Sequence, residues 1–369
     1  MRHATRPTVV VGALLLTGGL AACSVIPAGG GDGDDLLVGV AMPTTTSQRW
    51  IDDGENVQAQ LEALGHQVDL QFAEDDVPTQ VAQIQKMIDD GADALVIGSI
   101  DGTALKDVLA QASAADIPVI SYDRLIRDTQ DIDYYATFDN ARVGVQQATS
   151  LLSGLGVIDE TGEPTGVTGP FAIELFAGSP DDNNATVFYQ GAMSLLQPYI
   201  DSGVLVVTSG ETAFETIATP AWNGETAAKR LGPLLDAHYT SRRLDGILAP
   251  ADIISVPLLE VLRGAGYGTD AKPWPVVTGQ DADVTAVKAV VAGELHSTIY
   301  KDTRQLAEVA VTMVDALLSG EEPETNDVTS YDNGVMVVPS YLLASQVVTQ
   351  DNYEEVLVES GYYTAEELG

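Results

Sequence analysis

The chain has little basic charge and few of the residues that carry catalytic or metal chemistry. Its 369 residues include 17 lysines and arginines against 54 aspartates and glutamates, for a formal net charge of -37. A surface this acidic repels phosphate backbones, so we expect no nucleic-acid partner. The four histidines, at positions 3, 66, 238 and 296, lack metal-ligand spacing, and we predict neither a metal nor a cofactor. No G-x-S-x-G elbow or P-loop is present, so we expect neither a serine hydrolase of that type nor ATP hydrolysis by this chain.

The single cysteine, Cys23, excludes an internal disulfide. The apolar stretch Val9–Leu20 is too short to remain in a bilayer as a helix, and Arg2 and Arg6 precede it. The sequence "LAAC" that follows resembles the lipobox of bacterial lipoproteins, in which the cysteine is lipidated and becomes the new N-terminus. We therefore expect an extracytoplasmic protein anchored to the cell membrane by lipid. A plain secretory signal with a chance cysteine is the alternative.

From Leu36 onward, apolar segments typical of buried strands alternate with segments of helical periodicity. The composition, 45% hydrophobic and 19% charged, is that of a globular protein, and 369 residues allow two domains with cores of their own. Continuous apolar strands separated by helices favour parallel sheets covered on both faces. We expect strands in "LLVGVAM", "QVDLQFA", "ADALVIGSI" and "PVISYD", and helices over 50–64, 77–89 and 105–114.

The alternation restarts after Asn140, which predicts a second copy of the same α/β architecture, although no close sequence repeat links the halves. We expect strands in "FAIELFAG", "VLVVTSG", "LDGILAPAD", "PVVTGQD" and "STIYKD". The helices predicted between and before them cover 141–152, 189–197, 225–237, 256–263 and 284–291.

Polar or ionic side chains follow nearly every predicted strand, at the end where open parallel sheets bind ligands. Three cations and three anions are among them, and if they met in one cleft their formal charges would cancel. A neutral, polyhydroxylated ligand suits such a site because each hydroxyl both donates and accepts hydrogen bonds. Two tryptophans could stack on the apolar faces of a pyranose. These eight residues are Arg49, Arg124, Lys301, Asp123, Asp182, Asp281, Trp50 and Trp222.

Each of these residues also has a structural alternative. Asp182 or Asn184 would serve as the N-cap of the next helix, and for Asp139 and Asn140 we favour that role. Asp123 and Arg124 would form a structural ion pair. Trp50 would pack at the start of its helix, and Trp222 would be a hydrophobic staple beside an N-cap at Asn223.

Several segments, in this order, make the chain similar to the xylose-binding and multiple-sugar-binding branch of the periplasmic sugar-binding proteins. These are solute receptors of ABC importers, related to ribose- and galactose-binding proteins. The similarity spans about 36–368. It rests on "AMPTTTSQRWIDDG", "IGSIDGTAL", "ISYDRLI", "YYATFDNARVGVQQA", "GSPDDNNA", "VVTGQDADV", "STIYKDTR" and "NGVMVVPSYLL".

The resemblance implies which residues contact the sugar. Two come from the first loop, with the tryptophan as a stacking face, and Asp123 and Arg124 would hold adjacent ring hydroxyls. Ala251 departs from the polar or aromatic residue often found in the family, which implies a lost contact and a different sugar preference. The implied contacts are Arg49, Trp50, Asp123, Arg124, Asp182, Asn184, Trp222, Asp281 and Lys301, with Asp252 as a weak candidate.

The implied fold is that of a type I periplasmic binding protein, with two Rossmann-like lobes joined by crossovers near 139–142, 301–303 and 326–329. The implied division is a signal peptide over 1–22, a lipidated cysteine and tether over 23–35, a first lobe of 36–140 and 302–327, and a second lobe of 141–301 and 328–369. The implied function is delivery of an aldopyranose such as xylose, glucose, galactose or arabinose to the permease subunits of an ABC importer. The chain would act as a monomer and not as an enzyme.

Three alternatives remain open at this point. A sensory receptor would use the same site to present sugar to a membrane chemoreceptor or histidine kinase. A glycosidase would use two cleft carboxylates, but pairing them with cations predicts lowered pKa values and disfavours a neutral general acid. A sugar-responsive transcription regulator would need a DNA-binding head where the signal and tether stand.

Overall fold

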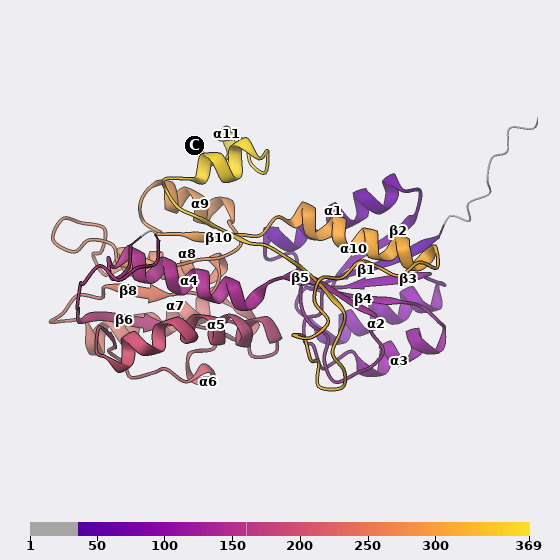
Figure 1. Ribbon diagram of the computed structural model, residues 1–369, viewed down its shortest axis with the longest axis horizontal. Helices are drawn as coiled ribbons and strands as arrows, with labels where there is room; N and C mark the ends of the chain where they lie inside the picture. The colour runs from indigo at the N-terminus through magenta and orange to yellow at the C-terminus, as the bar shows by residue number, and fades with distance from the viewer. Residues whose placement is uncertain (1–35, 160) are drawn as a thin grey trace, which may run out of the picture. The chain divides into compact units, whose positions relative to one another are not determined.

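The chain is described by a computed structural model that covers residues 36–159 and 161–369. The predicted signal peptide, the lipidation site at Cys23 and the tether lie outside the described residues. Over the part that is described, no helix combines the length and apolar character needed to cross a membrane. Two parallel sheets, each covered on both faces by helices, form the body of the protein, which confirms the predicted α/β class (Figure 1).

The first sheet contains six parallel strands in the order β11-β5-β4-β3-β1-β2. Alternate side chains of β1 enter different cores: Val38, Val40 and Met42 pack under α1 and α10, whereas Ala41 packs under α2 and α3. Burial on both faces explains why these strands read as continuous apolar runs. The bounds are β1 Leu37–Met42, α1 Gln48–Ala63, β2 Gln67–Phe72, α2 Val77–Asp89, β3 Ala94–Ile97, α3 Lys106–Ala114, β4 Val119–Tyr122, β5 Tyr134–Phe138, α10 Thr303–Leu318 and β11 Ser340–Leu343.

The second sheet contains four parallel strands in the order β7-β6-β8-β9. Helices α4 and α5 close the core on one face, and α7, α8 and α9 close the core on the other. The bounds are α4 Asn140–Gly154, β6 Phe171–Leu175, α5 Asn183–Asp201, β7 Leu205–Val207, α6 Phe214–Ile217, a 3-10 turn Pro220–Trp222, α7 Gly224–His238, β8 Gly246–Leu248, α8 Asp252–Gly264, β9 Val276–Val277 and α9 Val284–Val291.

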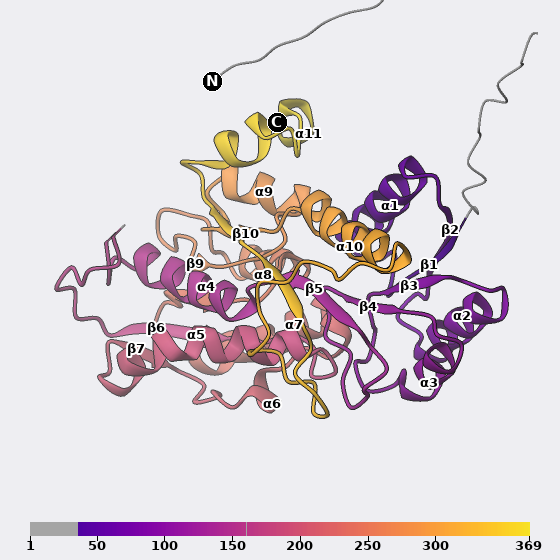
Figure 2. The ribbon, with the colours of Figure 1, turned by 45° about the vertical axis from the view of Figure 1, so that its right-hand side comes forward.

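A third, two-stranded sheet pairs β10 (Thr298–Tyr300) with β12 (Gln346–Val348) in antiparallel fashion. We expected β10 to continue the second parallel sheet, and a single parallel bridge between Thr278 and Ser297 is the remnant of that arrangement. After β12 the chain forms a π-helical turn, Glu354–Glu359, and α11, Ala365–Leu368. This C-terminal segment lies over α9 in both ribbon views (Figures 1 and 2).

The third crossover lies later in the chain than predicted. Residues 328–369 were assigned to the second lobe, but β11 pairs in parallel with β5 and completes the first sheet. Its side chains enter both cores of that sheet, with Tyr341 and Leu343 on one face and Leu342 on the other. The chain therefore leaves the first lobe only after Leu343. The physical reason is that β11 forms the edge strand of the first sheet and packs its side chains into the cores on both faces.

Candidate functional site

Nine of the ten residues predicted to contact a sugar line one cavity between the two lobes, and Asp252 does not. The cavity encloses about 550 Å³ of space free of protein atoms, part of it open to solvent. Its walls come from the loops that follow strands of both sheets and from the first turns of α1 and α5. The other lining residues are Thr44, Thr46, Ser47, Asp75, Phe188, Ala221, Ala251, Ile253 and Gln280.

Arg49 is the centre of the first group of ions. Its Nη2 lies 2.6 Å from Oδ1 of Asp123, and its Nη1 lies 3.3 Å from the other oxygen of the same carboxylate. Nη1 also approaches Oδ1 of Asp281, from the second lobe, at 3.5 Å. That oxygen receives Nζ of Lys301 at 2.9 Å. Arg49 and Lys301 thus share an anion, and the guanidinium bridges the lobes.

A second group of ions also bridges the lobes. Nε of Arg124, from the first lobe, lies 3.0 Å from Oδ2 of Asp182, from the second. The indole Nε1 of Trp222 donates to the same oxygen at 3.2 Å. The other carboxylate oxygen accepts from the backbone N–H of Asn184 at 2.9 Å and caps α5. Both predicted roles of Asp182, as helix cap and as cavity anion, are therefore realised by one side chain.

The two tryptophans are positioned differently. Trp50 lies close to two guanidinium groups, with Cζ of Arg49 at 5.1 Å and Cζ of Arg124 at 5.0 Å from its ring centroid. Such cation–π contacts stabilise cations that have lost much of their water. Trp222 depends on Gly178: a Cβ there would lie 2.1 Å from the indole ring, so only glycine leaves room for it. Asn223 caps α7 as predicted.

Left-handed backbone conformations occur at five cavity residues: φ is +58° at Asp75, +56° at Asp123, +54° at Ala221, +52° at Trp222 and +98° at Asp281. Residues other than glycine rarely adopt this region, so surrounding contacts must hold the backbone in this conformation. At Asp123 the backbone carbonyl accepts hydrogen bonds from Tyr135, Thr137 and Asn184. Since Asn184 belongs to the second lobe, this carbonyl is a third contact between lobes.

Burial and charge shift the pKa of Asp123 in opposite directions. Burial alone would raise it, but Arg49, Lys301 and Arg124 outweigh that effect and bring the pKa of Asp123 down to about 2. Burial opposes the charge of Arg49 too, yet Asp123, Asp53 and Asp281 leave its pKa well above the ordinary value. Both groups are therefore ionised at neutral pH, as the predicted pairing requires.

Asp182 differs from this expectation. Burial raises its pKa above the ordinary value although Arg124 lies beside it. The prediction that every paired carboxylate would have a lowered pKa is therefore wrong for Asp182, because the cost of desolvation exceeds the attraction of a single cation.

Sequence reasoning missed two acids beside the site. Asp53 lies one turn after Arg49 on α1, is fully buried, and approaches its Nε at 3.1 Å while accepting a hydrogen bond from Tyr122. Burial raises the pKa of Asp53 to about 7. The spacing of four residues on one helix was the signal. Asp75 lines the cavity and follows β2, so the rule applied to the other strand ends would have found it.

Asp252, the weak candidate, has a different place. Its carboxylate is fully buried and accepts hydrogen bonds from the backbone N–H groups of Gln280 and Asp283 and from the Thr298 hydroxyl. It therefore supports the loop that carries Asp281. No cluster of three His, Cys, Asp or Glu side chains suited to a metal ion occurs within 36–159 and 161–369.

The fold and the interlobe cavity define a class of protein. Residues 38–322 match the model of the periplasmic binding protein domain, and the chain belongs to that family. It is 54% identical over 335 residues to the multiple sugar-binding periplasmic receptor ChvE of Rhizobium radiobacter, covering 91% of this chain and 93% of that protein. It is 32% identical to the D-xylose-binding periplasmic protein of Escherichia coli, covering 90% and 93%.

A solved structure of a solute-binding protein also resembles this chain closely. The chain is 46% identical, with a TM-score of 0.84, to an ABC transporter solute-binding protein from Clostridium phytofermentans with bound β-D-glucose. The match covers 90% of this chain and 100% of that chain. The predicted resemblance to the xylose- and multiple-sugar-binding branch and the predicted type I fold are confirmed. The relatives named here are binding proteins rather than enzymes.

Proposed function

We propose that the chain is an extracytoplasmic receptor that binds a neutral aldopyranose between its lobes for an ABC importer. The observation that carries this proposal is the chemistry of the cavity, where buried cations and anions alternate and indole rings accompany them. Each ion already has a partner, so a charged ligand would leave one of them unmatched. A sugar hydroxyl, which donates to a carboxylate and accepts from a guanidinium, matches both signs.

Ligand binding and lobe closure are coupled in this proposal. The pairs Arg49–Asp281 and Arg124–Asp182 exist only when the lobes approach, and hydroxyls between them would add contacts made only in that state. A ligand shifts the balance between open and closed states by its differential affinity for the closed one. Permease subunits of an importer are the proposed partners that distinguish the two states.

Calorimetric titration with D-glucose, D-xylose, D-galactose and L-arabinose tests the proposal. We expect at least one sugar to bind with a Kd near or below about 1 μM. Arg124→Ala or Asp281→Ala should abolish binding while unfolding stays cooperative. Asp281→Asn, which keeps a polar side chain of the same size, should weaken binding to a Kd that calorimetry can still measure. Arg243→Ala removes an exposed ion pair with Asp245 and should leave the Kd unchanged. Binding of only an amino acid or a nucleoside would contradict the proposal.

We also propose that Cys23 carries a lipid that holds the receptor at the membrane surface. The support is the sequence pattern: a basic start, a short apolar run and small residues directly before the only cysteine. A chain with several acyl groups on one residue stays at the bilayer.

A further inference from the structure

The loop that presents Asp281 contains two successive residues in the left-handed region. The φ values are +98° at Asp281 and +55° at Ala282, and neither residue is glycine. Such a bend persists only where its surroundings fix it. Within the second lobe, the Asp281 N–H donates to the Ile299 carbonyl at 2.8 Å, and the Ala282 N–H donates to the Thr298 hydroxyl at 3.1 Å.

The C-terminal segment supplies a further support for this bend. The Tyr363 hydroxyl donates to the backbone carbonyl of Ala282 at 3.0 Å. The methyl group of Ala282 is fully buried in a cluster that includes Val356, Leu357 and Leu368 of the same segment. Residues more than 70 positions away in sequence therefore hold the backbone beside Asp281.

The same segment is attached to the first lobe. Nη1 of Arg304, in the first turn of α10, donates to the carbonyl of Gly361 at 3.1 Å, and its guanidinium lies 5.0 Å from the ring centroid of Tyr362. Asp302 fixes this guanidinium through two further contacts, at 2.8 and 2.9 Å. Helix α10 packs beside α1, which carries Arg49. The segment thus contacts the supports of both partners in the Arg49–Asp281 pair.

We propose that Tyr363 is a positioning residue for Asp281. Through the Ala282 carbonyl it holds the bend that directs the Asp281 carboxylate toward Arg49 and Lys301, so the C-terminal segment helps to set ligand affinity. This inference rests on the proposed sugar-binding function and concerns the same site.

Tyr363→Phe tests the inference because it deletes one hydroxyl and keeps the ring. Loss of a single hydrogen bond predicts a Kd about two- to tenfold weaker for the tightest-binding aldopyranose. Tyr353→Phe is the matched control, since among the described residues that hydroxyl bonds only to the exposed Glu354 side chain of the same segment. The control should keep the wild-type Kd, and both variants should unfold cooperatively without sugar. An unchanged Kd for Tyr363→Phe overturns the inference.

A double-mutant cycle with Asp281→Asn separates positioning from a general structural role. If Tyr363 acts through Asp281, Tyr363→Phe should have little further effect on the Kd once the Asp281 charge is gone. An equal loss in both backgrounds would mean that Tyr363 acts elsewhere, which contradicts the inference. Absence of sugar binding by the wild-type chain would overturn the proposed function, and this inference with it. The two failures are therefore distinguishable.

Discussion

Asp53 shows how one buried side chain links the site to solution conditions. It faces Arg49, Asp123, Tyr122 and Lys301, with Tyr362 nearby from the C-terminal segment. Its Oδ2 approaches Nε of Arg49 but is not aligned for a hydrogen bond. When Asp53 carries a proton, it adds no charge to the three cations and three anions predicted for the cavity. When it ionises, it adds one negative charge beside them.

We expect Asp53→Asn to flatten the pH dependence of stability. Burial raises the pKa of Asp53 from 3.8 to about 7, so the stabilisation from its proton is complete below about pH 4 and is lost as the pH rises through 7. This group alone costs the wild-type chain up to about 1.4 kcal/mol of unfolding free energy per pH unit in that window. Denaturant unfolding at pH 5 and pH 8 measures the effect. The unfolding free energy of the variant, relative to that of wild type, should be higher at pH 8 than at pH 5.

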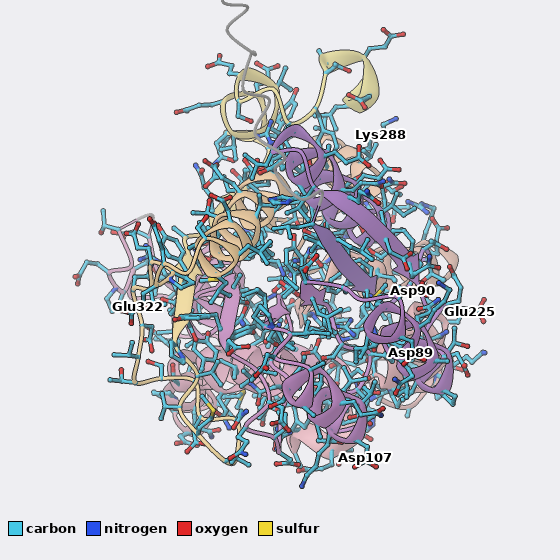
Figure 3. All side chains as sticks on the ribbon, turned by 90° about the vertical axis from the view of Figure 1, so that its right-hand side faces the viewer. Asp89, Asp90, Asp107, Glu225, Lys288 and Glu322 are labelled. Carbon is cyan, nitrogen blue, oxygen red and sulfur yellow. The ribbon has the colours of Figure 1, made fainter. Side chains whose placement is uncertain are left out.

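Asp107→Asn is the control for this measurement, because Asp107 projects from the exposed face of α3 (Figure 3). Its difference from wild type should be the same at both pH values. If the Asp53→Asn difference is also independent of pH, the buried carboxyl does not gain a proton on folding.

At the scale of elements, helix starts carry part of the site. The N-terminus of α5 is capped by Asp182, which also pairs with Arg124, whereas the N-terminus of α4 is capped by Asp139 through the Arg142 N–H alone. The two caps form a natural comparison, since only one of them also faces the cavity.

Asp139→Ala should lower the unfolding free energy by about 1 kcal/mol, the usual cost of a lost cap, and leave the sugar Kd within twofold. Asp182→Ala removes a cap and leaves the buried charge of Arg124 without its partner. We therefore expect the unfolding free energy to fall by about 3–5 kcal/mol and sugar binding to be lost. Asp182→Asn retains a capping oxygen and should lose affinity with a smaller drop in stability. Denaturant unfolding and calorimetry measure both effects. Weak binding by Asp139→Ala would show that the α4 cap also serves the site.

The sequence allowed some elements to be predicted closely and others poorly. Helix α2 has the bounds predicted from its apolar stripe, and the structure adds two local signals, an N-cap at Asp76 and Pro78 in the first turn. Helix α5 begins six residues before the prediction, since "DDNNA" was interpreted as a ligand loop and is also the first turn of the helix. Strand β11 was assigned to the wrong lobe, because pairing with β5 some 200 residues earlier leaves no local signal.

The candidate site followed from one rule, that parallel strands deliver ligand-binding side chains at their carboxyl ends. That rule located Asp123, Asp182 and Asp281. It could not locate Asp53, which lies within a helix, or Tyr363, which reaches the loop only through the C-terminal segment. Contacts made between distant segments depend on tertiary packing and are not visible in local patterns.

At the scale of the whole molecule, charge is distributed unevenly between surface and cavity. Exposed acids such as Asp89, Asp90 and Glu322 project into solvent (Figure 3), whereas two ion pairs of the cavity join the lobes. An acidic exterior favours solubility and is repelled by anionic lipid surfaces, so attachment to a membrane would need the proposed lipid rather than charge.

We therefore expect Cys23→Ser to release the protein from membranes. Fractionation of cells that produce the two forms should place wild type with the membrane and the variant in the soluble extracytoplasmic fraction. Mass spectrometry of the wild-type N-terminus should show an acylated cysteine. Sugar affinity should be equal for both forms, because Cys23 precedes the first strand. Wild-type protein that begins with an unmodified Cys23 would contradict the proposed lipid anchor.

Ala251, in the wall of the cavity, has a methyl group where the resemblance implies a polar or aromatic side chain. Three acids around the site already have structural contacts: Asp252 accepts a hydrogen bond from the loop at Gln280, Asp182 caps α5, and Asp123 pairs with Arg49. Replacing any of those would remove contacts that support the architecture, whereas a substitution at Ala251, which lines the same cavity, removes no side-chain hydrogen bond or ion pair. Divergence in which carbohydrate is accepted can therefore proceed at this position without dismantling the receptor.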